Sequence, residues 1–152
     1  MSTSNASYLR VLQILFGALI MGLVAFSAIV FFLVEGQEMG GSDLGMQFLI
    51  IVVGVTVASI AAGMLISKRV LDDIKPDAKV GEKLDRYRSA QLVRYVTAEG
   101  PGLLAQIGFL LTGEKQYFAL GALLLGYLLW MRPTRDKIIQ DLNLNQEEQK
   151  AL

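Results

Sequence analysis

Four apolar stretches, separated by polar segments, dominate the pattern of the 152-residue chain. The first two, residues 11–34 and 44–67, contain no charge. The third, residues 95–112, contains one carboxylate, and the fourth, residues 117–131, is the shortest. Apolar runs of about 20 residues are long enough to cross a bilayer as helices, which satisfy their own backbone groups. The pattern predicts an all-α integral membrane protein, an antiparallel four-transmembrane-helix bundle built from two hairpins.

The expected boundaries follow from these stretches and describe a single membrane domain over residues 1–152. Spans are expected at about 9–34, 44–67, 92–112 and 116–131, with a cytoplasmic loop at 68–91 and a cytoplasmic tail at 132–152. The first span is longer than the ~7–15 apolar residues of a signal peptide, so we expect it to be retained.

The distribution of basic residues predicts the orientation in the membrane. Lys and Arg number seven in residues 68–88 and four in the tail, but only one, Lys115, lies between the third and fourth spans and none between the first and second. By the positive-inside rule, both termini are expected on the cytoplasmic side of the membrane.

Two segments outside the spans show helical spacing. Glu82 and Arg86 are four residues apart, so the third helix is expected to begin before the membrane. Thr134 is suited to cap a short amphipathic helix over residues 135–144 that lies on the membrane surface. Residues 145–152 are expected to be disordered.

The third span carries a polar stripe, and its carboxylate is the main candidate for chemistry. Polar residues and one glycine recur at steps of three or four along one face: Arg88, Gln91, Tyr95, Glu99, Gly102 and Gln106. Glu99 would lie ~10 Å inside the hydrocarbon edge, where ionisable groups are costly and usually functional. Gln13, Ser59 and Tyr127 would lie at a similar depth on the other helices, so we predict that these four groups converge.

Pro101 follows this carboxylate and is flanked by Gly100 and Gly102, so a kink is expected. Proline has no N–H to donate to the Thr97 carbonyl. Arg94 or a water molecule could supply the missing donor. Glu99 is then either a neutral structural acid at the kink or a protonatable, cation-binding group. The sequence leaves both interpretations open.

Small residues at intervals of four predict tight helix packing on three spans. They are Ala18 and Gly22, then Gly54, Ala58 and Ala62, then Ala122 and Gly126. The packed helix could belong to the same chain or to another subunit.

Composition narrows the possible chemistry. The chain has no cysteine and no histidine, so neither metal ligation by these residues nor a histidine general base is available. Its 14 basic residues equal its 14 acidic ones, so no net charge favours nucleic acid. We expect no enzyme activity, no metal site and no cofactor. The expected partners are the lipid bilayer and either further copies of the chain or a larger membrane complex.

Residues EGPGLLAQIGFLLTG and LLLGYLLWMRPTRDKIIQDLNL, in the C-terminal half, resemble a group of uncharacterised small four-span bacterial inner-membrane proteins. The resemblance implies the same location and no particular activity. Glu99 beside small residues also resembles the membrane glutamate of rotary ATPase proteolipid subunits, although their glycine-rich first helix is missing here. Small multidrug exporters are similar in having four spans and one membrane glutamate, but in their first helix.

Two main functions are compatible with these features, and a third option is an interaction with lipid through the amphipathic tail at residues 135–152. The first is a non-enzymatic scaffold or accessory subunit of a membrane assembly, packing through its small residues. The alternative is a proton- or cation-coupled small transporter, or an ion-translocating subunit, centred on Glu99 and acting as an oligomer.

Overall fold

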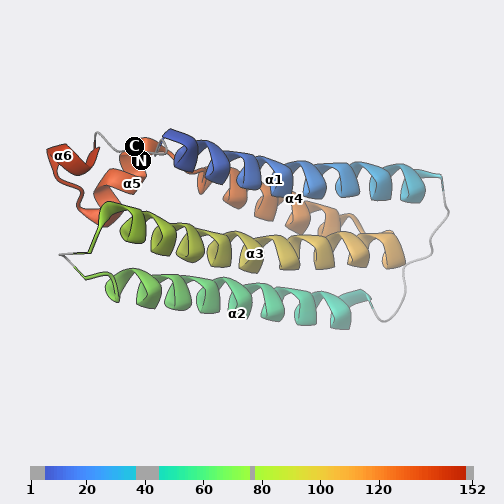
Figure 1. Cartoon of the computed structure of the whole chain (residues 1–152). Coiled ribbons are helices and arrows are strands. Elements are labelled where there is room, and N and C mark those ends of the chain that lie inside the picture. The colour runs from blue at the N-terminus through green and yellow to red at the C-terminus, as the bar shows by residue number, and fades with distance from the viewer. Residues whose placement is uncertain (1–5, 37–44, 76–77, 150–152) are drawn as a thin grey trace.

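The computed structural model describes residues 6–36, 45–75 and 78–149, and all regular structure within these ranges is helical. The described helices are α1 (Ala6–Glu35), α2 (Gly45–Asp72), α3 (Val80–Thr112), α4 (Lys115–Trp130), α5 (Arg135–Leu142) and α6 (Gln146–Gln149) (Figure 1). The expected outer loop between the first two helices falls mainly on residues 37–44, outside the described ranges.

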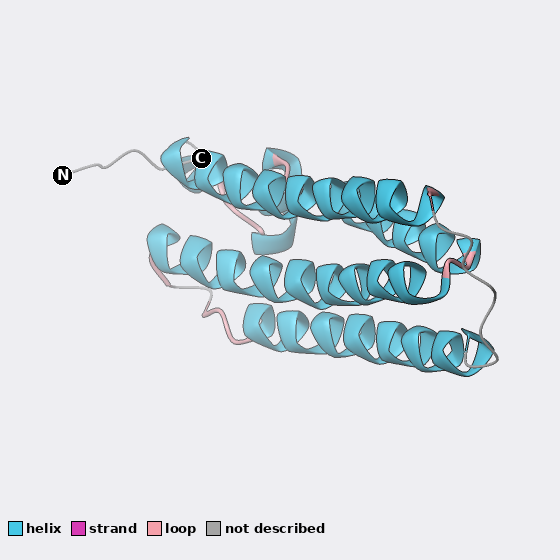
Figure 2. Cartoon of the chain, turned by 90° about the vertical axis from the view of Figure 1, so that its right-hand side faces the viewer, coloured by secondary structure: helices cyan, strands magenta, loops and turns pink. Residues whose placement is uncertain are grey.

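The four long helices α1 to α4 lie side by side, with α3 in the central position (Figures 1 and 2). α3 contacts α1, α2 and α4, whereas α2 packs mainly against α3. α1 and α3 begin at the end of the molecule where α2 and α4 finish, so successive helices run in opposite directions. The third apolar segment is thus the one against which the others pack.

Local signals place the helix ends. Gly113 ends α3 with a left-handed φ of 70°, and its N–H donates to the Phe109 carbonyl at 2.8 Å. Thr134 precedes α5, and its side chain accepts from the N–H of Lys137 at 3.4 Å, as predicted for an N-cap.

Side chains from several helices form two apolar clusters. One cluster, at the α5 end, includes Leu12, Phe16, Leu84, Tyr87, Tyr95, Leu128 and Ile138. The other includes Val30, Val34, Val52, Phe109 and Tyr117. The buried α1 residues recur at helical spacing, so α1 presents one narrow face to the protein.

Residues 68–91, expected as a cytoplasmic loop, are largely helical, and the early start of the third helix that Glu82 and Arg86 predicted is confirmed. α2 continues to Asp72 and α3 begins at Val80, so only a short connection separates them. The last turns of α2 and the first turns of α3 carry charged residues, which lie beyond the apolar runs. Lys, Arg and Glu are good helix formers, so the helices continue through them.

The C-terminal segment also differs from the expectation. α5 forms as predicted, but Ile138 and Leu142 are buried in the protein's own cluster, so its apolar face is not free for a membrane. Residues expected to be disordered form α6, where the Glu148 carboxylate accepts from Lys83 Nζ at 2.7 Å. Lys83 and Glu148 are 65 positions apart in the chain, so local sequence patterns cannot predict their contact.

Within the described residues, α1 and α2 are each long and apolar enough to cross a membrane by length and composition. α4 has only 16 residues, and the apolar part of α3 contains Glu99.

Candidate functional site

The centre of the candidate site is the backbone break at Pro101. Pro101 is buried within α3, which nevertheless continues as one helix to Thr112. Because proline has no N–H, the Thr97 carbonyl lacks its usual donor four residues ahead. The Ser59 hydroxyl of α2 donates to this carbonyl at 2.8 Å. Ser59, and not the expected Arg94, therefore donates to the carbonyl at the break.

A glycine brings α2 close to this point. Gly63 lies one turn after Ser59, and a Cβ atom added there would overlap the Thr97 side chain. The Thr97 hydroxyl is occupied within its own helix, donating to the Val93 carbonyl at 2.8 Å. α2 and α3 thus meet through Ser59, Gly63 and Thr97, and the expected small-residue face of α2 is not involved.

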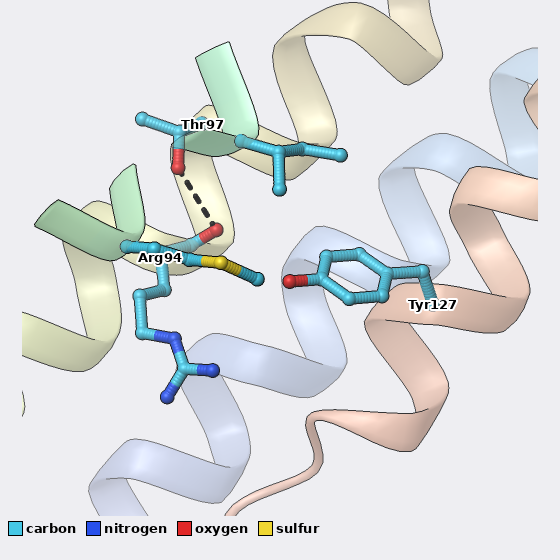
Figure 3. A pocket seen from close by; sticks show the side chains of 5 residues that line it. Arg94, Thr97 and Tyr127 are labelled. Atoms are coloured by element: carbon cyan, nitrogen blue, oxygen red, sulfur yellow. Dashed lines mark hydrogen bonds between the residues drawn. The ribbon is translucent and has the colours of Figure 1, made fainter. Parts of the chain in front are cut away.

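Tyr127 approaches the same region from α4. A small pocket beside Thr97 is lined by Ile60, Met64, Arg94, Thr97 and Tyr127, and Figure 3 shows the Tyr127 hydroxyl pointing into it. The Arg94 guanidinium lies away from the Thr97 hydroxyl in this view. The structure therefore brings Ser59 and Tyr127 to neighbouring parts of α3, around Thr97 and not around Glu99.

Glu99 and Gln13 are placed differently. Glu99 is half-buried, does not line this pocket, and makes no hydrogen bond or ion pair to another described residue. Gln13 is exposed, because its neighbour Leu12 occupies the buried face of α1 and successive helical residues point ~100° apart. The predicted convergence of the four groups is therefore wrong for Gln13.

Tyr95 and Gln106 are buried members of the polar stripe. The Tyr95 ring packs 5.1 Å from that of Phe16, and its hydroxyl lies 3.5 Å from the Met131 carbonyl, a long hydrogen bond. Gln106 is 1% exposed, and its Nε2 occupies the space where a Gly121 side chain would project. Its Oε1 has no partner among the described residues. Both side chains connect α3 to its neighbours.

The predicted packing residues lie on the surface of the chain. The exposed set comprises Ala18, Gly22, Gly54, Ala58, Ala62, Ala122 and Gly126. Glycines at other positions make the close approaches: Gly63 against Thr97, Gly102 against Leu23, Gly108 against Tyr117 and Gly121 against Gln106. A glycine within an apolar helix is a sequence signal for a close helix contact. The sequence of one helix, however, does not show which of its faces meets a neighbouring helix.

Of the kink residues, Gly102 meets Leu23 closely, at 3.2 Å from an added Cβ, whereas Gly100 faces open space. Within the described ranges, no group of three or more acidic residues is placed to hold a metal ion. The contacts of Ser59, Tyr95 and Gln106 connect α3 to α2 and to α4. Comparison with protein-family models, curated proteins and solved structures finds no match for this chain.

Proposed function

We propose that the chain is a multi-pass protein of a bacterial inner membrane, with α1 to α4 as an antiparallel four-span bundle and both termini in the cytoplasm. The alternating helix directions support this topology, because they place most basic residues at one end (Figure 1). α4, at ~24 Å, spans the ~30 Å hydrocarbon core only with local thinning or with help from flanking residues.

The outer surface supports the membrane setting. Large apolar side chains cover α1, α2 and α4, including Met21, Phe32, Ile50, Leu123 and Trp130, each at least 66% exposed. Contiguous apolar surface of this kind is unfavourable in water and suits a lipid or protein neighbour.

Within that setting we propose a non-enzymatic scaffold or accessory subunit that holds a second membrane helix against α2. The observation that carries this proposal is the unused small-residue face of α2. Gly54, Ala58 and Ala62 are exposed, and nothing lies within 4 Å of a Cβ placed on Gly54. At about 3.6 residues per turn, this face lies opposite the α3-facing positions Thr56 and Gly63. Small faces let helix backbones approach closely in lipid.

Cysteine crosslinking tests this assignment cleanly, because the chain has no cysteine of its own. Ala58→Cys, oxidised in membranes, should form a disulfide-linked dimer if the neighbour is a second copy, because both copies then carry the thiol. A different subunit has to be captured by attaching a photoreactive maleimide to the same thiol, and it should give an adduct of another mass. Val53→Cys, also exposed on α2 but off the small face, is the matched control. Equal crosslinking at both positions, or none at Ala58, would contradict the proposal.

Crowding the face is a second test that needs no oxidant. Ala58→Leu should weaken the assembly, whereas Val57→Leu, at the neighbouring exposed position, should not. Size-exclusion or single-molecule counting of subunits in lipid gives the readout.

A transporter or ion-translocating subunit centred on Glu99 is the second candidate. It is favoured by one observation, the half-buried carboxylate without a partner among the described residues. Proton or cation uptake into vesicles, compared between the wild type and Glu99→Gln, distinguishes the candidates. Uptake that is lost in a correctly folded Glu99→Gln variant would favour transport, and a fully assembled variant without any change in flux would favour the scaffold.

A further inference from the structure

A hollow on the proposed cytoplasmic side lies between α3, the end of α4 and α5. Its volume is about 260 Å³, smaller than the ~300–1,000 Å³ of pockets that enclose drug-sized ligands. Its polar walls are Gln91 and Arg94 of α3 and Lys137, Gln140 and Asp141 of α5, and Trp130 of α4 forms an apolar wall. The end of α4 and α5, which are neighbours in the chain, therefore combine with a distant part of α3 into one small polar site.

We propose that this hollow binds a phosphate group, and that the headgroup of an anionic phospholipid supplies it. Two cationic side chains, Arg94 and Lys137, line the hollow, against one carboxylate, Asp141. Asp141 already accepts a hydrogen bond from the buried Tyr87 hydroxyl at 3.1 Å. The hollow therefore has an excess of positive charge.

Arg94 is the principal donor in this proposal. Its Nε is buried and has no hydrogen-bond partner among the described residues. In Figure 3 the guanidinium extends away from the Thr97 and Tyr127 hydroxyls. A guanidinium group presents a planar fork of donors that matches the oxygens of a phosphate. No described residue accepts a hydrogen bond from this guanidinium, so its donors other than the buried Nε are available to a phosphate in the hollow.

Lys137 has one donor to spare. Its Nζ donates to the carbonyls of Trp130 and Arg132, at 3.0 and 3.4 Å, where α4 ends. An ammonium group has three N–H donors, so a third can reach into the hollow. The two carbonyls also hold the ammonium group beside the Trp130 wall.

Trp130 favours a lipid over a free phosphate ion as the source. Its side chain is 74% exposed and lies on the apolar surface that continues along α4 to Leu123. Tryptophan is enriched at the membrane interface, and basic pockets on the cytoplasmic side of helical membrane proteins bind lipid headgroups. Acyl chains could then lie along α4 while the phosphate occupies the hollow. This inference rests on the proposed membrane topology.

Trp130 also provides the readout, since it is the single tryptophan of the chain. Full-length protein in phosphatidylcholine vesicles would be titrated with phosphatidylglycerol carrying brominated acyl chains, which quench tryptophan on contact. Brominated phosphatidylcholine serves as the zwitterionic comparison. We expect preferential quenching by phosphatidylglycerol, and an apparent affinity about tenfold weaker in Arg94→Gln, since that change removes a charge-assisted contact.

Arg86→Gln is the matched control, because it removes the same charge from α3 at an exposed position outside the hollow. It should keep the wild-type preference. Lys137→Gln, on the exposed side of α5, should also weaken the preference for phosphatidylglycerol. This variant tests the lipid site if Arg94→Gln does not fold.

The outcomes separate this inference from the proposed topology. Failure of the protein to enter vesicles at all would contradict the topology. A protein that enters but is quenched equally by both lipids, or equally in Arg94→Gln and Arg86→Gln, would overturn the lipid site alone. Relief of quenching by millimolar inorganic phosphate at constant ionic strength would assign the hollow to a free phosphate instead.

Discussion

The Ser59 hydroxyl lies 2.8 Å from the Thr97 carbonyl oxygen, the acceptor that Pro101 deprives of its helical donor. One side chain of α2 thereby completes the backbone of α3. A buried carbonyl without a donor is costly, particularly in hydrocarbon where water cannot replace the bond. The pairing also sets the register of the two helices, because only the residue opposite Thr97 can supply the hydroxyl.

A double-mutant cycle tests the coupling between Ser59 and Pro101. Ser59→Ala should lower the free energy of unfolding by about 1 kcal/mol, because the Thr97 carbonyl loses its donor. In a Pro101→Ala background the new N–H of residue 101 can reach that carbonyl, so the same change should cost much less. Denaturant titration in detergent micelles measures both. Equal costs in the two backgrounds would mean that the hydroxyl does not serve the proline break.

Gly63 should tolerate no larger side chain. Gly63→Val is expected to lower the free energy of unfolding by about 1–3 kcal/mol, because added atoms meet Thr97 and push α2 away from α3. Gly17→Val, at a position with nothing within 4 Å of an added Cβ, is the control and should be close to neutral. Thermal unfolding in the same detergent compares the two, and similar losses would refute the close approach.

The attachment of α6 should depend on pH. The hydrogen bond from Lys83, with a second from the Asn145 N–H, lowers the pKa of Glu148 below its usual value. A carboxyl whose pKa is lower in the folded state stabilises that state above its unfolded pKa of ~4.3, and the stabilisation is lost as the pH falls through the folded value.

A spin label on Glu147→Cys, the only thiol in such a chain, reports this change. The label should be restrained at neutral pH and become mobile as the pH falls through the lowered pKa of Glu148 in the folded chain. With Glu148→Gln added, the label should be mobile at neutral pH and insensitive to acid. A label that behaves alike in both chains would show that the Lys83 contact does not hold α6.

The docking of α5 should depend on its apolar face. Ile138 is fully buried against α1, α3 and α4 residues, so Ile138→Ala should weaken docking by about 2–5 kcal/mol. Faster hydrogen exchange of the α5 amides, with those of α3 unchanged, is the expected result. Gln140→Ala, at an exposed position of the same helix, should leave exchange unaffected. Unchanged exchange in Ile138→Ala would indicate that the helix is held by other contacts.

The helical segments could be predicted from the sequence because long apolar runs leave helices as the only structure that satisfies the backbone in lipid. The N-cap at Thr134 and the helix end at Gly113 could also be predicted, because each depends on residues close together in the chain. The candidate site was predictable only in part. Pro101 predicts that the Thr97 carbonyl lacks its helical donor. The residue that donates to this carbonyl, Ser59, lies 38 positions away from Thr97 on another helix.

The faces of the helices could not be assigned in the same way. Small residues recur on several sides of these apolar helices, so spacing favoured Gly54 and Ala58, whereas the chain packs through Gly63 and Gly121. A helix that is apolar on all sides has no polar face to indicate which side is exposed. Which face packs against another helix therefore depends on the shape of its neighbours.

By itself, the sequence determined where the apolar parts of the four long helices and the helix after Thr134 form, and where the basic residues gather, because these depend on residues adjacent in the chain. Only the tertiary structure decided that Ser59 completes the Pro101 break, that α5 turns its apolar face inward, and that Arg94 and Lys137 line one hollow. Each of these joins segments far apart in the chain, and it depends on helix rotation and close packing, which no local pattern specifies.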